Sequence, residues 1–479
     1  MLLDSALDKI PLIRRCRQST GTIWAVASLF LFIDTFIYSL TVANLPDILQ
    51  DQMHVSKSSN GVVTAMFGIG GLLGGLIAGF LSDRLHTRRS LQLMAGVTYI
   101  AAGIVFYCSR HYYQLLIFRL INGVASGVAC TMLYTTVGDV YPADLLGFKV
   151  SIVYFANNIA YTTGPIVGQK LFDLNGIHGT ASIVIAFGAL EIFLLLTVVE
   201  ESLTLRRMVR SHGAAAAISA SSSSSAEFAP PSIVKSPQLS EMGADSTKAV
   251  SEETVSSEAK GTGHATPSDD EGDLPIWKLI MRLPVFVSTI SIVVSIGIQC
   301  TLEGMVPLHL DDKFHRSDNS GITFVIFGLA LTLFVPCVGS ANDWLIGRWG
   351  EQMRYYVMLF GSLSTIFSIL VMALAGSYAV MMVGYVLFAF TQLCMFIPGQ
   401  SAYGDFVNYS KVDSMAQSYA ISTLSWATGA IALPPIGSAL YAGAGFATPL
   451  ASITAVACIV CAAACLIYPA REALRRRQV

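Results

Sequence analysis

The chain has 479 residues, of which 53% are hydrophobic and only 13% are charged, and its mean hydropathy is +0.61. This composition is too apolar for a soluble domain of that length and predicts an integral membrane protein. The net charge of −2 gives no basic excess of the kind that binds nucleic acid, so we expect no such partner. Several of the nine cysteines lie inside apolar runs, which favours packing roles over a disulfide or metal site.

The apolar stretches are long enough to cross about 30 Å of hydrocarbon as helices. We therefore predict an all-α membrane protein in which the lipid bilayer surrounds most of the chain. The twelve predicted spans are residues 22–46, 61–82, 90–108, 113–138, 148–170, 180–199, 285–309, 320–341, 354–375, 378–404, 412–442 and 446–468.

The spans divide into two groups of six. Between them, residues 201–283 are rich in Ser, Ala, Pro and acidic residues and cannot bury enough apolar surface to fold alone, which predicts a disordered linker. This linker is a tether between bundles, or alternatively a site of serine phosphorylation. The predicted organisation is an N-terminal arm (1–21), a first bundle (22–200), the linker, a second bundle (284–468) and a basic tail (469–479).

Lys and Arg residues gather on one side of the predicted topology. They occur in the arm, after the second, sixth and eighth spans, and in the tail. Because positive charge marks the cytoplasmic side, both termini and the 201–283 linker are predicted to be cytoplasmic. We favour the plasma membrane as the location, with a vacuolar or vesicle membrane as the alternative.

A charged motif, "GFLSDRLHTRR" (79–89), follows the second span, and it recurs as "GSANDWLIGRW" (339–349) after the eighth. The recurrence in one register indicates two six-helix halves related by an internal repeat, as in secondary transporters. The basic residues of the motif, including Arg84, also fix orientation. The matched pairs are Gly79 with Gly339, Asp83 with Asp343, and Arg88 with Arg348.

Four ionisable residues lie inside the spans: Asp34 in the first, Arg119 in the fourth, Glu191 in the sixth and Glu303 in the seventh. Burying a charge in hydrocarbon costs several kcal/mol and is tolerated mainly at a cavity or beside a partner. A carboxyl group in such surroundings can take up and release protons near neutral pH. The alternative is structural: Arg119 pairs permanently with a neighbour, and Glu191 lies near a helix end.

Polar and aromatic residues in the spans are further candidates for substrate contact. Each needs a hydrogen-bond partner, which a neighbouring helix supplies as well as a ligand does. They are Tyr38, Asn122, Tyr134, Asn157, Asn158, Tyr161, Gln299, Gln392 and Gln400.

Three motifs together resemble the major facilitator superfamily: the 79–89 segment, "RLINGVASG" (119–127) in the fourth span, and "GPIVG" (164–168) in the fifth. The resemblance implies a fold of twelve transmembrane helices in two pseudo-symmetric six-helix bundles. It also implies that Asp83 stabilises one closed conformation, and that the cavity is shaped by Gly164, Pro165, Gly168 and Pro307.

Within the superfamily, two segments of this chain resemble the branch of vesicular amine transporters and twelve-span drug:proton antiporters. "LFIDTFIYSLTVANLPDIL" (31–49) and "LEGMVPLHL" (302–310) place Asp34 and Glu303 at this branch's acidic positions. Three of the branch's other charged positions are Phe67, Leu393 and Thr423 in this chain, so its site is more apolar.

We therefore predict a proton-coupled antiporter that exports a small organic molecule, such as a drug, toxin or secondary metabolite, by alternating access. It is expected to be no enzyme, to need no cofactor beyond the proton gradient, and to act as a monomer. Asp34 and Glu303 would alternate between protons and substrate, and Arg119 would tune a nearby carboxylate. A vesicular amine loader and, more distantly, a membrane sensor or scaffold are the alternatives.

Overall fold

The computed structural model describes residues 19–42, 44–56, 58–85, 87–140, 143–197, 280–314, 320–410 and 415–478. The predicted linker lies outside these residues up to position 279, as does nearly all of the N-terminal arm. Every regular element in the described residues is helical, in agreement with the prediction. The elements are α3 (Thr20–Val42), α4 (Leu45–Asp47), η1 (Ile48–Gln52), α5 (Ser59–Leu85), α6 (Arg89–Tyr107), α7 (Tyr112–Val140), α8 (Ala143–Thr197), α11 (Leu283–Phe314), α12 (Ser320–Trp349), α13 (Met353–Ala373), α14 (Tyr378–Ser410), α15 (Met415–Ala444) and α16 (Ala447–Gln478).

Ten stretches of the described residues are long and apolar enough to cross a membrane. One of them, residues 152–197 within α8, contains a break at Gly176, where φ is +58°. Glycine is suited to this left-handed conformation because it has no Cβ. Since α8 therefore holds two helices, each of the twelve predicted spans overlaps a helix of the described residues, although α15 is not among the ten stretches.

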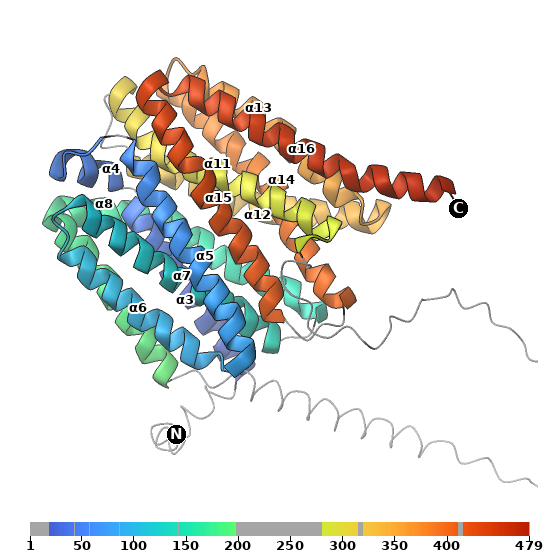
Figure 1. Ribbon diagram of the computed structural model, residues 1–479, viewed down its shortest axis with the longest axis horizontal. Coiled ribbons are helices and arrows are strands. Elements are labelled where there is room, and N and C mark those ends of the chain that lie inside the picture. The colour runs from blue at the N-terminus through green and yellow to red at the C-terminus, as the bar shows by residue number, and fades with distance from the viewer. Residues whose placement is uncertain are drawn as a thin grey trace, which may run out of the picture. The chain divides into compact units, whose positions relative to one another are not determined.

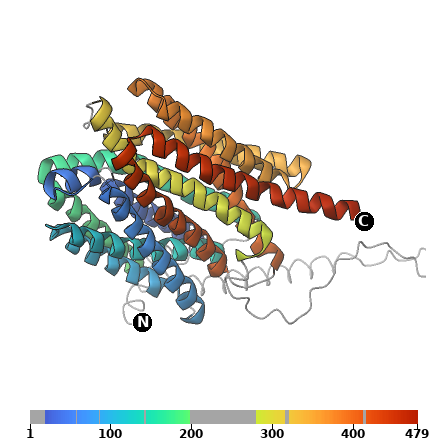
Figure 2. The same cartoon turned by 45° about the horizontal axis from the view of Figure 1, so that its top comes forward.

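The helices form two halves that pack side by side (Figures 1 and 2). In the first half, α5 packs on α7, α3 on α8, and α6 on both α7 and α8. In the second half, α13 packs on α14 and α16, and α11 on α14 and α15. The halves meet where α5 contacts α15 and where α8 contacts α12. The repeat pairs α5 with α12 and the first part of α8 with α15, so these two contacts are equivalent across the pseudo-two-fold.

Close backbone contact holds the helices of the first half together. A Cβ built on Gly74 of α5 would overlap the Val124 carbonyl of α7, and one on Gly127 of α7 would overlap the Gly71 carbonyl of α5. In lipid, where apolar surface gives little drive for helices to associate, such small-residue contacts supply van der Waals packing.

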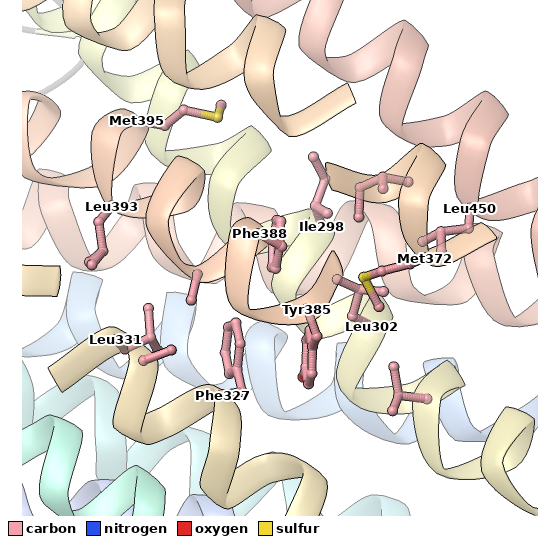
Figure 3. Close-up of a cluster of buried hydrophobic side chains, with 14 of the residues drawn as sticks. Ile298, Leu302, Phe327, Leu331, Met372, Tyr385, Phe388, Leu393, Met395 and Leu450 are labelled. Atoms are coloured by element: carbon pink, nitrogen blue, oxygen red, sulfur yellow. The ribbon is translucent and has the colours of Figure 1, made fainter. Parts of the chain in front are cut away.

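The second half has a core of aromatic and aliphatic side chains, drawn in Figure 3. Within it, Phe327 of α12 and Tyr385 of α14 stack with ring centroids 4.3 Å apart and an interplanar angle of 9°. Phe388 continues the stack 5.9 Å from Phe327. This packing joins α12 to α14.

Candidate functional site

Glu303 lies on α11 with 1% of its surface exposed, at the boundary between the two halves. Its carboxylate accepts hydrogen bonds from the hydroxyls of Tyr38, at 2.5 Å, and Tyr161, at 2.6 Å, and from the amide of Gln299, at 2.8 Å. Tyr38 belongs to α3 and Tyr161 to α8, whereas Gln299 lies one turn before Glu303 on α11. The two tyrosines therefore tie a carboxylate of the second half to the first half.

Further side chains of the second half surround this carboxylate. The Gln392 amide of α14 donates a hydrogen bond to the Gln299 side-chain oxygen. The Tyr385 hydroxyl is buried and has no hydrogen-bond partner among the described residues, although it lies within electrostatic range of Glu303. The structure therefore gathers Tyr38, Tyr161, Gln299 and Gln392, which the sequence named only as separate candidates, around one carboxylate.

Arg119 of α7 is also buried, with 1% exposed, and lies within electrostatic range of Glu303. Its Cζ atom stands 5.9 Å from the ring centroid of Tyr38, 6.0 Å from that of Phe67 and 5.8 Å from that of Phe118. None of its three side-chain nitrogens has a hydrogen-bond partner among the described residues. Aromatic faces, and not a direct carboxylate contact, surround this guanidinium.

Asp34 forms a second buried cluster within the first half. It accepts hydrogen bonds from the Tyr99 hydroxyl of α6 and from the Cys130 thiol of α7, the latter at 3.2 Å. Glu191 of α8 is 2% exposed and lies within electrostatic range of Asp34, while its Oε2 atom has no partner among the described residues. Two carboxyl groups from different helices thus lie in one buried cluster of the first half.

The two clusters share helix α3. Asp34 and Tyr38 are four residues apart, or about 6 Å along the helix axis at about 1.5 Å per residue. A change in the position of α3 therefore moves the Tyr38 hydroxyl, which donates to Glu303, together with the Asp34 carboxylate.

Other predicted polar residues fall into two groups. Asn122 and Asn158 are buried, and amide atoms of both lack partners among the described residues. The rest are paired: Asn157 accepts a hydrogen bond from Thr35, Gln400 accepts one from Ser422 at 2.9 Å, and Tyr134 packs against the core of the first half. Asn122 and Asn158 thus have hydrogen-bonding capacity that a ligand could use. The contacts of Asn157, Gln400 and Tyr134 are accounted for within the protein.

The repeated motif has different structures in the two halves. In the first, α5 ends at Leu85, and the buried Arg88 returns to donate a hydrogen bond to Ser82. In the second, α12 continues to Trp349, and Asp343 and Arg348 are exposed on it.

The remaining motif residues are also placed. Gly79 is buried, Gly339 is half-buried, and Arg84 is exposed 5.8 Å from the Phe80 ring. The Asp83 side chain lies outside the described ones, so its latch role stays a prediction.

The "GPIVG" glycines face α3. A Cβ on Gly164 would overlap the Ser39 hydroxyl, and one on Gly168 would overlap the Leu40 carbonyl. Pro165 and Pro307 lie inside α8 and α11, and both are buried. Gly164 and Gly168 therefore set the close approach of α3 and α8, the helices that carry the two tyrosines of Glu303.

Sequence reasoning missed Tyr99, Cys130 and Tyr385, which complete the two clusters. A hydroxyl or thiol inside an apolar span was the available signal. That signal is weak, because many such groups bond to the backbone of their own helix, as Thr131 does to the Gly127 carbonyl at 2.8 Å.

A sequence profile of the Major Facilitator Superfamily matches residues 27–415, most of the chain. The chain belongs to the Major Facilitator Superfamily. It is therefore a multi-pass membrane protein of a family of secondary transporters.

Relatives in this superfamily match about a third of the chain. The human Protein spinster homolog 1 is 28% identical over 190 residues, which cover 38% of this chain and 35% of the relative. Multidrug resistance protein 3 of Bacillus subtilis is 26% identical over 153 residues, covering 32% and 30%. This chain thus spans only about a third of the length of these relatives, so their activities are not transferred to it as facts.

Solved structures show the same fold over nearly the whole chain. A POT family transporter, in complex with a thioalcohol conjugated peptide, superposes with a TM-score of 0.64 at 16% identity and covers 94% of this chain and 96% of its own. The human organic anion transporter MFSD10 (TETRAN) has a TM-score of 0.59, also at 16% identity, and covers 93% and 99%. At this identity the similarity establishes the fold alone.

Proposed function

We propose that this major facilitator protein is a proton-coupled transporter of a small organic molecule, with Glu303 as its proton-binding residue. The observation that carries the proposal is the pair of tyrosine hydroxyls from the first half, 2.5 and 2.6 Å from a carboxylate of the second half. Alternating access requires contacts between the halves to form and break, and here such a contact involves an ionisable group.

Protonation changes the strength of this contact. Hydrogen bonds to a charged group contribute about 1.5–3 kcal/mol each, against about 0.5–1.5 kcal/mol for neutral pairs. A proton on Glu303 therefore weakens the link to Tyr38 and Tyr161 and favours separation of the halves. A ligand or proton shifts a conformational equilibrium by its differential free energy in the two states, which this arrangement supplies.

The first candidate for the direction of transport is export in exchange for protons, as the sequence resemblance implies. In it, Asp34 and Glu303 bind protons or the substrate in turn, and Asp83 stabilises one closed state. Similarity to a bacterial multidrug resistance protein supports this candidate. We propose that the chain acts as a monomer, with the proton gradient as its only energy source.

The second candidate is cotransport of substrate and proton. It is favoured by one observation, the buried Arg119 guanidinium without a hydrogen-bond partner among the described residues. A transporter that binds an anion there gains from a proton on Glu303 at the same time. The structural neighbour described as an organic anion transporter is consistent with such a substrate.

Purified protein in proteoliposomes tests the proposal. Each compound of a panel of organic cations, anions and neutral molecules is added outside, and an internal pH dye records proton movement. We expect at least one compound to move protons, and Glu303→Gln to abolish the signal. Glu351→Gln, at an exposed position between α12 and α13, is the control. Compound flux without proton movement, or an unchanged signal in Glu303→Gln, would contradict the proposal; the sign of the pH change separates exchange from cotransport.

A further inference from the structure

Arg119 presents more hydrogen-bonding capacity than its surroundings use. A guanidinium carries five N–H donors. Here it is 1% exposed, and its nitrogens have no acceptor among the described residues. The three aromatic rings about 6 Å away attract this cation, but they supply no hydrogen-bond acceptor for its N–H groups. These unused donors therefore suit a ligand that supplies hydrogen-bond acceptors to Arg119.

Neighbouring polar atoms point to the same kind of group. Asn122 lies one turn after Arg119 on α7, and both atoms of its side-chain amide lack partners among the described residues. The Asn158 amide nitrogen and the Tyr385 hydroxyl, on helices that contribute to the Glu303 cluster, are likewise buried without an acceptor. Donors outnumber acceptors in this set, which suits a ligand rich in acceptors and carrying negative charge.

An aromatic cluster adjoins Arg119 across the boundary of the halves. The Tyr38 and Phe67 ring centroids are 4.8 Å apart, and Trp426 of α15 lies 6.0 Å from the first and 5.7 Å from the second. Aromatic rings at these spacings offer apolar faces and edges to a planar or aliphatic body. The charge above the ring faces of Tyr38 and Phe67 is the positive one of Arg119, whereas the Glu303 carboxylate meets Tyr38 at its hydroxyl.

We infer that the substrate is an amphipathic organic anion, whose carboxylate, phosphate or sulfonate group binds Arg119 and whose apolar body packs on Tyr38, Phe67 and Trp426. This inference rests on the proposed transport function and names the substrate class of that site. Arg is suited to the role because its planar fork matches the oxygens of such groups.

The inference sets the direction of coupling. An ionised Glu303 and a substrate anion would both be attracted to Arg119 and would repel each other. The other groups facing Glu303 are Tyr38, Tyr161, Gln299, Cys300 and Tyr385, none of which is a cation. A proton on Glu303 removes the repulsion, so anion and proton bind together, which is the cotransport candidate.

Binding of a matched set of probes tests the substrate class. Naphthylacetate, naphthylmethylphosphonate, naphthylethylamine and naphthylethanol share one apolar body and differ in charge. The chain has five tryptophans, so the part of the fluorescence quenching in detergent-solubilised protein that Trp426→Phe removes reports on Trp426, with thermal shift as the second readout. We expect one or both anions to bind at least tenfold more tightly than the amine and the alcohol, and the better of the two identifies the anionic group.

Variants locate the binding group. Arg119→Gln should lose at least tenfold in anion affinity, whereas Arg110→Gln, at an exposed arginine before α7, should lose none. Arg119→Lys and Asn122→Ala keep most of the packing, so they replace Arg119→Gln if it does not fold and should also weaken anion binding. Anions that bind no better than the alcohol, or that bind these variants as wild type, would overturn the inference.

Failure of this inference is distinguishable from failure of the proposed function. Proton movement driven by a cationic or neutral compound, with no preference for anionic probes, refutes the anionic substrate and leaves proton coupling intact. Selective anion binding without any proton-linked flux refutes the proposed proton coupling and leaves the anionic substrate class intact.

Discussion

Tyr161→Phe removes one hydrogen bond from Glu303 and leaves an aromatic ring in place. The lost bond is 2.6 Å long in a buried setting and connects α8 to α11. Because the hydroxyl favours the ionised carboxylate, its removal makes Glu303 hold its proton to higher pH. A hydrogen bond to a charged group is worth about 1.5–3 kcal/mol, against about 0.5–1.5 kcal/mol for a neutral one. The difference of about 1–1.5 kcal/mol corresponds, at 1.36 kcal/mol per pH unit, to a rise of about one unit in the midpoint.

The assay for Tyr161→Phe is the pH dependence of substrate-linked proton movement in proteoliposomes. Tyr38→Phe, which removes the 2.5 Å bond, should raise the midpoint by a similar amount. The two changes meet at one carboxylate, so the double variant need not equal their sum. Tyr113→Phe, at a position 58% exposed, is the matched control and should leave the midpoint unchanged. A midpoint that stays constant or falls in Tyr161→Phe would refute the assignment of Glu303 as the proton site.

Four other predictions follow from the same structure. Gly168→Ala should lower the melting temperature, since its Cβ would overlap the Leu40 carbonyl and overpacking costs about 1–3 kcal/mol, whereas Gly347→Ala, which meets open space, should not. Asp34→Asn should abolish proton-linked transport at normal membrane abundance; undiminished flux would assign Asp34 a structural role. Asp83→Asn should slow transport without changing abundance, and an unchanged rate would exclude the latch. A membrane-impermeant maleimide should label the exposed Cys108 from the face opposite the cytoplasm, and labelling only in inside-out vesicles would reverse the predicted topology.

Much of the fold was predictable because length and hydropathy are sufficient to find spans in a membrane protein. The ends of the helices were less predictable. The 79–89 and 339–349 segments share Gly, Asp and Arg in one register, yet α5 ends at Leu85 and α12 continues to Trp349. In the first half the buried Arg88 donates a hydrogen bond to Ser82, whereas Arg348 of the second half is exposed on the continuing helix, a difference that the shared motif does not predict.

The site was predictable residue by residue but not as a cluster. Asp34 and Glu303 stood out because a charge in an apolar span is costly. Their partners did not, because lipid-facing and buried faces of a span are both apolar and the sequence does not distinguish them. Tyr99, which donates to Asp34, is therefore indistinguishable in sequence from Tyr107, whose side chain is 45% exposed.

Glu303 is one of several contacts that join the halves on the side where α5 begins and α11 ends. The Asn60 amide donates to the Gly304 carbonyl at 2.8 Å, and the Gly321 amide donates to the Gln169 side chain at 3.2 Å. These neutral bonds are worth about 0.5–1.5 kcal/mol each and do not change with pH, whereas each tyrosine bond to an ionised carboxylate is worth about 1.5–3 kcal/mol. In the proposed function, the larger share of this closure therefore depends on the charge of Glu303, and a single proton on that carboxylate would favour the open arrangement of the two halves.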